Sequence, residues 1–133
     1  MKKILLAYDG GEPARRALET TIELAKAFGA SVSVVSVVPV HSGRSPVDPW
    51  DDRTVHAQEL IEAKEILLRA GIEPDLLEPA GDPARKIEEI AREGAFDTVI
   101  LGSRGLGALE RTLQGSVSEH VVTHSDATVV IAH

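Results

Sequence analysis

A series of glycines in the last third of the chain has the spacing of an anion-binding loop. Gly102 and Gly105 are three residues apart at the end of an apolar run, and Gly115 and Ser116 follow after nine further residues. Glycines let backbone N–H groups approach an anion closely, and the start of a helix adds unpaired donors and a partial positive charge. Ser116 also opens a capping box with Glu119, which has a purely structural interpretation. The whole pattern predicts a loop that binds a phosphate chain.

Alternating strands and helices must position this loop. Short apolar runs, mostly rich in β-branched residues, predict strands, and segments with helical periodicity separate them. The predicted strands are residues 4–8, 31–38, 72–78, 98–101 and 128–132, and the predicted helices are 13–28, 57–68, 83–94 and 116–124. Residues 39–52, which hold three prolines, predict a long surface loop. Its Trp50 is interpreted as core cover rather than as a lid over a ligand.

This order of elements predicts an α/β fold with a doubly wound five-stranded parallel sheet and helices on both faces. With 133 residues, the chain is expected to form a single domain over 1–133. Ligands of such sheets bind beyond the carboxyl ends of the strands, where the strand order reverses. If the strands 4–8 and 98–101 are neighbours there, Asp9 and Gly102 flank one cleft. Phe28, Ile61 and Leu68 are assigned to the buried faces of their helices.

Composition excludes several classes of function. The net charge of −7 opposes binding to nucleic acid or to an anionic membrane, so neither is expected as a partner. The absence of cysteine excludes disulfides and thiolate metal sites. The apolar run near the N-terminus is too short for a signal peptide or a membrane span, which predicts a soluble, cytoplasmic protein.

Other nucleotide and catalytic motifs do not fit. No Gly-Lys pair exists for a Walker P-loop, the segment after the first strand lacks the Rossmann glycine pattern, and no G-x-S-x-G elbow occurs. A phosphoacceptor receiver domain would share the fold, but the third strand ends in Leu77-Glu78-Pro79 rather than an aspartate. His120 and His124 have the spacing of zinc ligands without the glutamate of that motif, so a solvated helix face or an interface is favoured over metal binding.

Together, the opening ILLAYDG, the Gly102-x2-Gly105-x9-Gly115-Ser116 pattern and its continuation Val117-Ser118-Glu119 resemble the ATP-binding members of the universal stress protein family. The resemblance covers almost the whole chain. It implies an adenine nucleotide-binding, Rossmann-like fold with strand order 3-2-1-4-5, often dimeric and cytoplasmic, with a role in the stress response.

The resemblance also implies a set of cofactor-binding residues for ATP and its Mg²⁺. The residues that would surround the phosphates are Gly102, Arg104, Gly105, Gly115, Ser116, Val117 and Ser118. The residues that would flank the adenine are Ala7, Tyr8, Val37, Val38 and Leu101. Asp9 would lie near the ribose or the nucleotide-bound Mg²⁺. Family members often have Asp-Gly-Ser where this chain has Asp9-Gly10-Gly11, and glycine is still an acceptable N-cap for the helix that follows.

These observations favour an ATP-binding regulatory module whose bound and free forms present different surfaces. A slow ATPase and a dimeric scaffold that does not use nucleotide are the alternatives, and no catalytic base is assigned. ATP is not distinguished from ADP, AMP or a cyclic nucleotide. In the implied strand order, residues 128–132 form an apolar edge strand, which predicts a homodimer through antiparallel pairing of this strand. Val129 and Ile131 would then face one side of the sheet, and Val130 the other.

Overall fold

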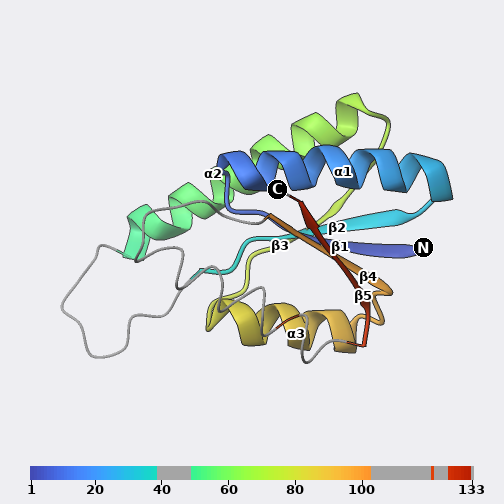
Figure 1. The fold of residues 1–133 in the computed structure, drawn as a ribbon. Coiled ribbons are helices and arrows are strands. Elements are labelled where there is room, and N and C mark those ends of the chain that lie inside the picture. Colours follow the sequence, from blue (N-terminus) through green and yellow to red (C-terminus); the bar gives the residue numbers. More distant parts are fainter. Residues whose placement is uncertain (39–48, 103–120, 122–125, 133) are drawn as a thin grey trace.

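β1 (Lys3–Ala7) lies at the centre of a five-stranded parallel sheet in the computed structural model (Figure 1). The other strands are β2 (Ser31–Val35), β3 (Asp75–Leu77), β4 (Thr98–Gly102) and β5 (Thr128–Ala132). Their order in the sheet is β3-β2-β1-β4-β5, and every pairing is parallel. The predicted fold class and the strand order implied by the resemblance are therefore confirmed, and the order reverses between β1 and β4.

The structure describes residues 1–38, 49–102, 121 and 126–132, with the backbone alone for 49–56. Three helices connect the strands within this part: α1 (Glu12–Phe28), α2 (Pro49–Arg69) and α3 (Pro83–Glu93). The helix predicted over 116–124 lies outside the described residues except for Val121, which is helical and buried. Among the described helices, none combines the length and the apolar character that a membrane span requires.

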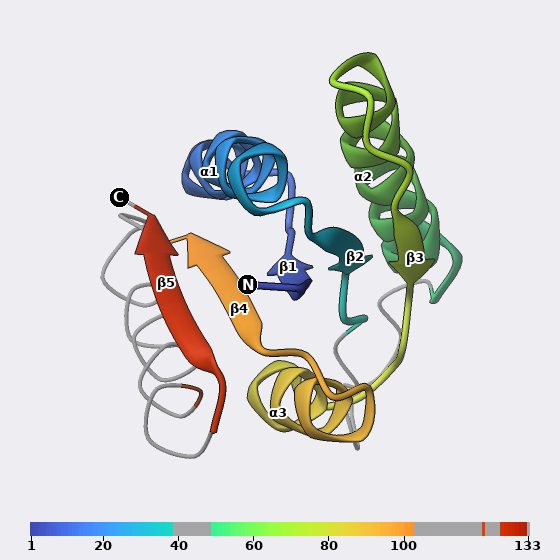
Figure 2. The ribbon, with the colours of Figure 1, turned by 90° about the vertical axis from the view of Figure 1, so that its right-hand side faces the viewer.

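The two faces of the sheet are covered by different helices (Figure 2). On one face, α1 and α2 bury Leu18 and Leu67 against side chains of β1 and β2 such as Leu6 and Val34. On the other face, α3 contributes Ile87 to a second cluster. Parallel strands that are buried on both faces need apolar residues at successive positions, which is why the central strands read as continuous apolar runs.

Helix caps follow the sequence signals. The N-cap of α1 is Gly11 in an extended conformation without a side-chain hydrogen bond, and Pro13 lies in the first turn. α1 ends at Gly29, whose φ of 65° is left-handed. At α3, the Asp82 side chain accepts a hydrogen bond from the Arg85 N–H at 3.1 Å. The prediction that glycine can replace a serine cap at the start of α1 is confirmed.

Two predicted strands are shorter in the structure because prolines interrupt the ladder between them. β2 ends at Val35 rather than at residue 38, and β3 covers only three of the seven residues in 72–78. Pro74 precedes β3 and Pro79 follows soon after it, and proline cannot donate to a ladder. Beyond the ladder, Val38 forms an isolated bridge with Ala80.

The prediction of a loop over 39–52 is wrong for its last four residues, because α2 already begins at Pro49. Residues 39–48 lie outside the described part of the chain. Proline is tolerated in the first turn of a helix, where its missing N–H has no partner to lose. Trp50 therefore lies in the first turn of a helix rather than in a loop.

Three apolar residues assigned to buried helix faces are exposed instead. Phe28 is 58% exposed, Ile61 52% and Leu68 45%, whereas Leu60 and Leu67 are buried. Ile61 and Leu68 each follow a core leucine by one residue, which rotates them about 100° around the helix and away from the sheet. Phe28 is the last residue of α1, beside the exposed Gly29.

Candidate functional site

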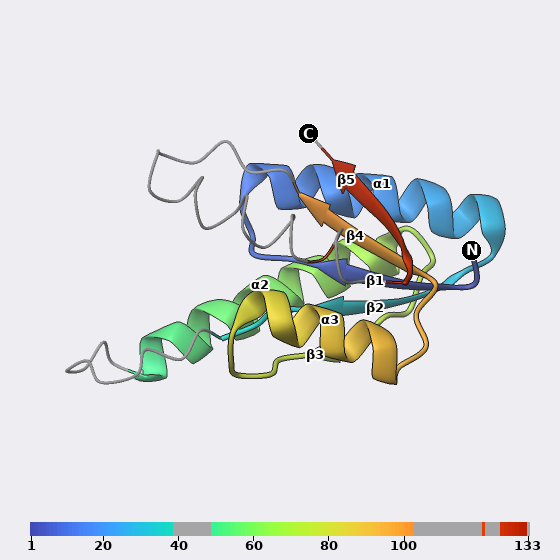
Figure 3. The ribbon, with the colours of Figure 1, turned by 60° about the horizontal axis from the view of Figure 1, so that its bottom comes forward.

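The carboxyl ends of β1 and β4 lie side by side, as Figure 3 shows from below. Leu6 pairs with Ile100, so the residues that follow them leave the sheet at the same edge. This confirms the adjacency on which the expected cleft depended. The segment 9–11 follows β1 there, and Gly102 is the last residue of β4. Parallel strands whose order reverses at this point form the usual ligand edge of an open α/β sheet.

Gly102 has a packing role that the sequence did not reveal. A Cβ atom built on it would be 2.6 Å from the backbone C and 2.7 Å from the backbone O of Pro13, and 2.9 Å from the N of Ala14. Backbone atoms at these distances cannot move aside as a flexible side chain can. The missing side chain of Gly102 thus lets the first turn of α1 lie directly on the end of β4.

Asp9 and Gly10 form a tight turn over residues 9–11. Oδ1 of Asp9 accepts a hydrogen bond from the Gly11 N–H at 3.0 Å, and Gly10 has a φ of +78°, a conformation that favours glycine. A Cβ atom on Gly10 would be 2.6 Å from Oε2 of Glu59, a residue of α2. The turn that carries Asp9 is thus closed by its own hydrogen bond, and the side chain of Glu59 lies beside Gly10.

Tyr8 is only 2% exposed, and its side chain belongs to the core between the sheet, α1 and α2. Its hydroxyl group donates to Oε1 of Glu62 at 3.3 Å, and the same oxygen pairs with Arg15 at 3.0 Å. Burial, and then the charge of Glu62, raise the pKa of Tyr8 above its usual value. Tyr8 therefore presents its backbone rather than its ring at the edge of the sheet.

Glu59 is the ionisable residue at this edge that sequence reasoning missed. Burial first, and the charge of Glu62 second, raise its pKa to about 7. A carboxyl group whose pKa lies near neutral pH is often part of a functional site. The sequence signal that could have identified Glu59 is its position on the helix. Glu59 and Glu62 are three residues apart, and each precedes a buried residue, Leu60 or Ala63, so both lie at the border of the buried face.

The remaining predicted residues divide into two groups. Ala7, Val37 and Leu101 all contact the same apolar cluster on the α3 side of the sheet. Val38 is half-buried, and its N–H donates to the Pro79 carbonyl at 2.8 Å. The residues outside the described part of the chain are Arg104, Gly105, Gly115, Ser116, Val117 and Ser118.

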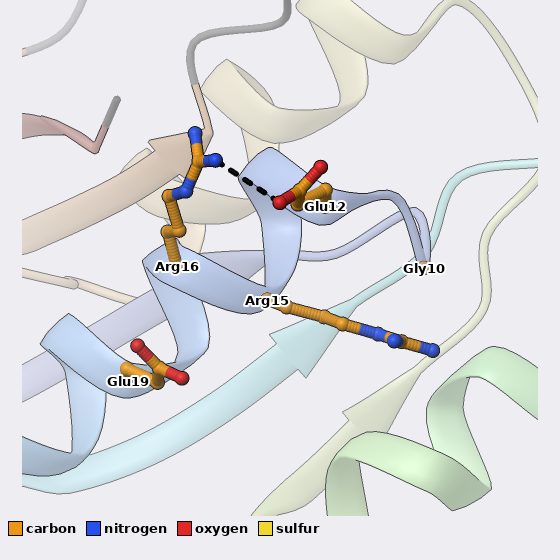
Figure 4. A pocket seen from close by; sticks show the side chains of 5 residues that line it. All are labelled: Gly10, Glu12, Arg15, Arg16 and Glu19. Atoms are coloured by element: carbon orange, nitrogen blue, oxygen red, sulfur yellow. Dashed lines mark hydrogen bonds and ion pairs between the residues drawn. The ribbon is translucent and has the colours of Figure 1, made fainter.

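An open hollow of about 560 Å³ lies beside the first turns of α1 (Figure 4). Its walls are Gly10 and four charged residues of α1, and Arg16 pairs there with Glu12 at 3.1 Å. Arg15 extends away from this pair toward α2. Small-molecule sites are mostly apolar with a few polar groups, so we do not assign a ligand to this charged surface.

The part of the chain that the structure describes has no group of three or more His, Cys, Asp or Glu side chains that could hold a metal ion. Asp9 offers a carboxylate directly after β1, and one of its oxygens already accepts the Gly11 N–H. This donor set fits a Mg²⁺ ion that keeps phosphate oxygens and waters as its main ligands, the usual arrangement for nucleotide-bound Mg²⁺.

Known proteins resemble this chain in both sequence and fold. The sequence model of the universal stress protein family matches residues 1–133. A universal stress protein of Thermus aquaticus is 33% identical over 133 residues, which cover 98% of this chain and 97% of that protein. A universal stress protein family structure from Burkholderia pseudomallei has a TM-score of 0.78 at 26% identity, with 98% of this chain and 94% of that one covered.

A third relative was solved with a ligand. The universal stress protein of Archaeoglobus fulgidus in complex with dAMP has a TM-score of 0.78 at 23% identity, and the match covers 100% of this chain and 98% of that one. At this identity the likeness concerns the fold alone. The match of the family over the full length of the sequence is the decisive finding: the chain belongs to the universal stress protein family.

Proposed function

We propose that this universal stress protein binds ATP with Mg²⁺ at the carboxyl edge of β1 and β4 and acts in the cytoplasm as a nucleotide-dependent regulatory module of the stress response. The observation that carries the proposal is the pairing of β1 with β4, which brings the 9–11 turn and Gly102 to one edge. The glycine pattern that predicts a phosphate loop starts at Gly102 and continues along the chain from this edge.

The adenine would lie against the strand ends. Ala7, Val37 and Leu101 lie at or just beyond the carboxyl ends of β1, β2 and β4 and contact one apolar cluster on the α3 face of the sheet, and an aromatic base needs such a surface beside a few polar groups. Asp9 would accept a ribose hydroxyl or a water of the Mg²⁺ ion, which the phosphates would hold. The dAMP complex of the Archaeoglobus fulgidus relative supports an adenine nucleotide as the ligand.

The direct test is a calorimetric titration of nucleotide-free protein with Mg-ATP. We expect saturable binding that Asp9→Ala weakens, because the carboxylate at the ribose is lost. Gly105→Ala is expected to weaken binding as well, since a methyl group would block the close approach of backbone to phosphate. No heat and no thermal shift at millimolar ATP would contradict the proposal. Assays of phosphate release on the same samples are expected to show slow hydrolysis at most.

We also propose that the protein is a homodimer through β5. This strand lies at the edge of the sheet, and its residues Val129, Val130 and Ile131 are only partly buried. Val130 packs toward the α1 side, whereas Val129 and Ile131 pack toward the α3 side, as the alternation of the strand predicted. An apolar edge without lysine or proline favours pairing with a second copy.

The direction of the backbone groups of β5 supplies a sharp test. The Thr128 N–H donates to the Asp97 carbonyl at 2.9 Å, which is the side of β4. Because successive N–H groups alternate along a strand, the Val129 N–H points to the open edge. Val129→Pro should therefore give a monomer while the β4 ladder is kept, and Val129→Ala, which retains the N–H, should stay dimeric. If sedimentation equilibrium of the parent protein at tens of micromolar shows a single species with the mass of one chain, 14.2 kDa, the dimer is contradicted.

A further inference from the structure

Glu59 of α2 fills the space beside Gly10 in the 9–11 turn. A Cβ atom built on Gly10 would be 2.6 Å from Oε2, 3.0 Å from Cγ and 3.2 Å from Cδ of Glu59. Any other residue at position 10 would place its side chain there. Glu59 therefore occupies the space that a side chain at position 10 would need, and the positive φ of 78° at Gly10 is a conformation that favours glycine.

Other charged and titratable groups lie on the elements that meet near this turn. Glu62, whose charge acts on Glu59, follows it on α2. Tyr8 and Asp9 come from the segment after β1, and Arg15 comes from α1. Arg15 pairs with Glu62 at 3.0 Å, and the Tyr8 hydroxyl group donates to the same oxygen. Because burial and Glu62 raise the pKa of Glu59 to about 7, its neutral and ionised forms are both populated at neutral pH.

We propose that Glu59 is a positioning residue for the nucleotide site: its neutral carboxyl group keeps the 9–11 turn in the form that accepts the nucleotide, and its ionised form loosens the turn and repels the phosphates. The inference rests on the proposed function, because it concerns the same edge of the sheet. An ionised carboxylate requires hydration, which close contact with the turn restricts. Repulsion between this charge and the phosphates acts in the same direction.

The two forms predict a defined pH dependence. If only the neutral form binds tightly, the apparent affinity for a nucleotide falls about tenfold between pH 6 and pH 8. By linkage, a nucleotide that favours the neutral form also raises the proton affinity of Glu59. Binding at pH 7 is therefore accompanied by the uptake of a fraction of a proton from the buffer.

The effect on the turn is tested without nucleotide. In the free protein, the NMR amide signals of Gly10 and Gly11 are expected to titrate with a midpoint near pH 7. They should lose this titration in Glu59→Gln, which keeps the shape of the side chain and removes its charge. The matched control is Glu65→Gln, since Glu65 is exposed on the same helix and should leave the titration unchanged. Signals that do not titrate, or that titrate equally in Glu59→Gln, overturn the inference.

The effect on binding is tested by calorimetry with ADP at pH 6, 7 and 8 in buffers of different ionisation enthalpy. Glu59→Gln is expected to bind at pH 8 about as tightly as the parent does at pH 6, without its share of the proton uptake. The nucleotide's own phosphate titrates equally in both proteins, so their difference reports Glu59. A parent and a Glu59→Gln protein with parallel pH profiles overturn the inference. Failure of ADP and ATP to bind at any pH overturns the proposed function itself, while the titration of the free turn still decides the coupling of Glu59 to Gly10.

Discussion

The two edges of the sheet are built in different ways. At the amino edge, Asp97 connects the starts of β1, β4 and β5. Its side chain accepts hydrogen bonds from the N–H groups of Lys2 and Lys3, at 2.8 and 3.1 Å. Its carbonyl accepts the Thr128 N–H. At the carboxyl edge, the hydrogen bond from the Gly11 N–H to Asp9 and a left-handed glycine conformation at Gly10 form the 9–11 turn, and the side chain of Glu59 lies beside it.

This difference separates stability from function. The amino edge is closed by hydrogen bonds that set the strand register, and Lys3 adds a donor to the Gly94 carbonyl and a cation–π contact 4.6 Å from the centre of the Phe96 ring. The carboxyl edge combines glycines at close backbone contacts with a carboxyl group whose pKa is about 7. Ionisable groups of that kind are costly for stability and useful for binding. Changes at the amino edge should therefore affect folding alone.

The largest expected effect is that of Gly102→Ala at the carboxyl edge. Its methyl group would meet the backbone of Pro13 and Ala14 within 3 Å, so we expect a loss of about 3 kcal/mol in the free energy of unfolding. The matched change at the amino edge is Gly94→Ala, whose nearest contacts, at 2.4 and 2.8 Å, are with the Phe96 ring, which can move. Urea denaturation should show the smaller loss for Gly94→Ala, and equal losses would contradict the packing role of Gly102.

Gly10→Ala is expected to cost about 2 kcal/mol, because a left-handed residue other than glycine is strained by roughly 1–2 kcal/mol and the new methyl group also meets Glu59. The second part of this cost depends on Glu59. In a Glu59→Ala background, the same change should cost about 1 kcal/mol less, as measured in a double-mutant cycle. Additive effects of the two changes would show that Glu59 does not restrict position 10.

Asp97→Asn at the amino edge is expected to lower stability by about 1 kcal/mol at pH 7, a figure already reduced for its exposure to solvent. The Lys2 amide, followed by the Thr98 hydroxyl group, lowers the pKa of Asp97 below its usual value. A lowered pKa in the folded state gives stability that is present above the unfolded pKa and lost as the pH falls through the folded pKa. The difference between parent and variant should thus disappear in acid, and a difference that persists at pH 2 would contradict this account.

The smallest effect is expected for Arg15→Ala. Its ion pair with Glu62 is largely exposed, with 60% of the arginine side chain accessible, and exposed pairs contribute little to stability. Thermal unfolding at low and at high salt should show a small difference that salt reduces. A large loss of stability that salt does not reduce would mean that the pair is an integral part of the carboxyl edge.

The sequence predicted the elements well where local chemistry decides them. Strands such as β1 follow from apolar runs, and α3 follows from the Asp82 cap and Pro83, because these signals act within a few residues. The start of α2 at Pro49 was mispredicted, since three prolines in a row of polar residues are typical of a loop as well. The strand order came from the family resemblance rather than from periodicity.

The site was predictable only where the chain marks it locally. Asp9 and Gly102 end their strands and are visible in the sequence, so their common edge followed from the fold class. The contact of Gly10 with Glu59 joins residues about fifty positions apart, and that of Gly102 with Pro13 about ninety. No periodicity encodes such contacts, because they depend on how α1 and α2 pack on the sheet.

We propose that an adenine nucleotide binds at the carboxyl edge of β1 and β4 and not at the amino edge. Both edges can be observed in one experiment, by NMR spectroscopy of the amide groups during a titration with Mg-ATP. We expect saturable shifts at Gly10, Gly11 and Gly102, with Lys3, Gly94 and Asp97 unchanged. Shifts concentrated at the amino edge, or none at either edge at millimolar Mg-ATP, would contradict it.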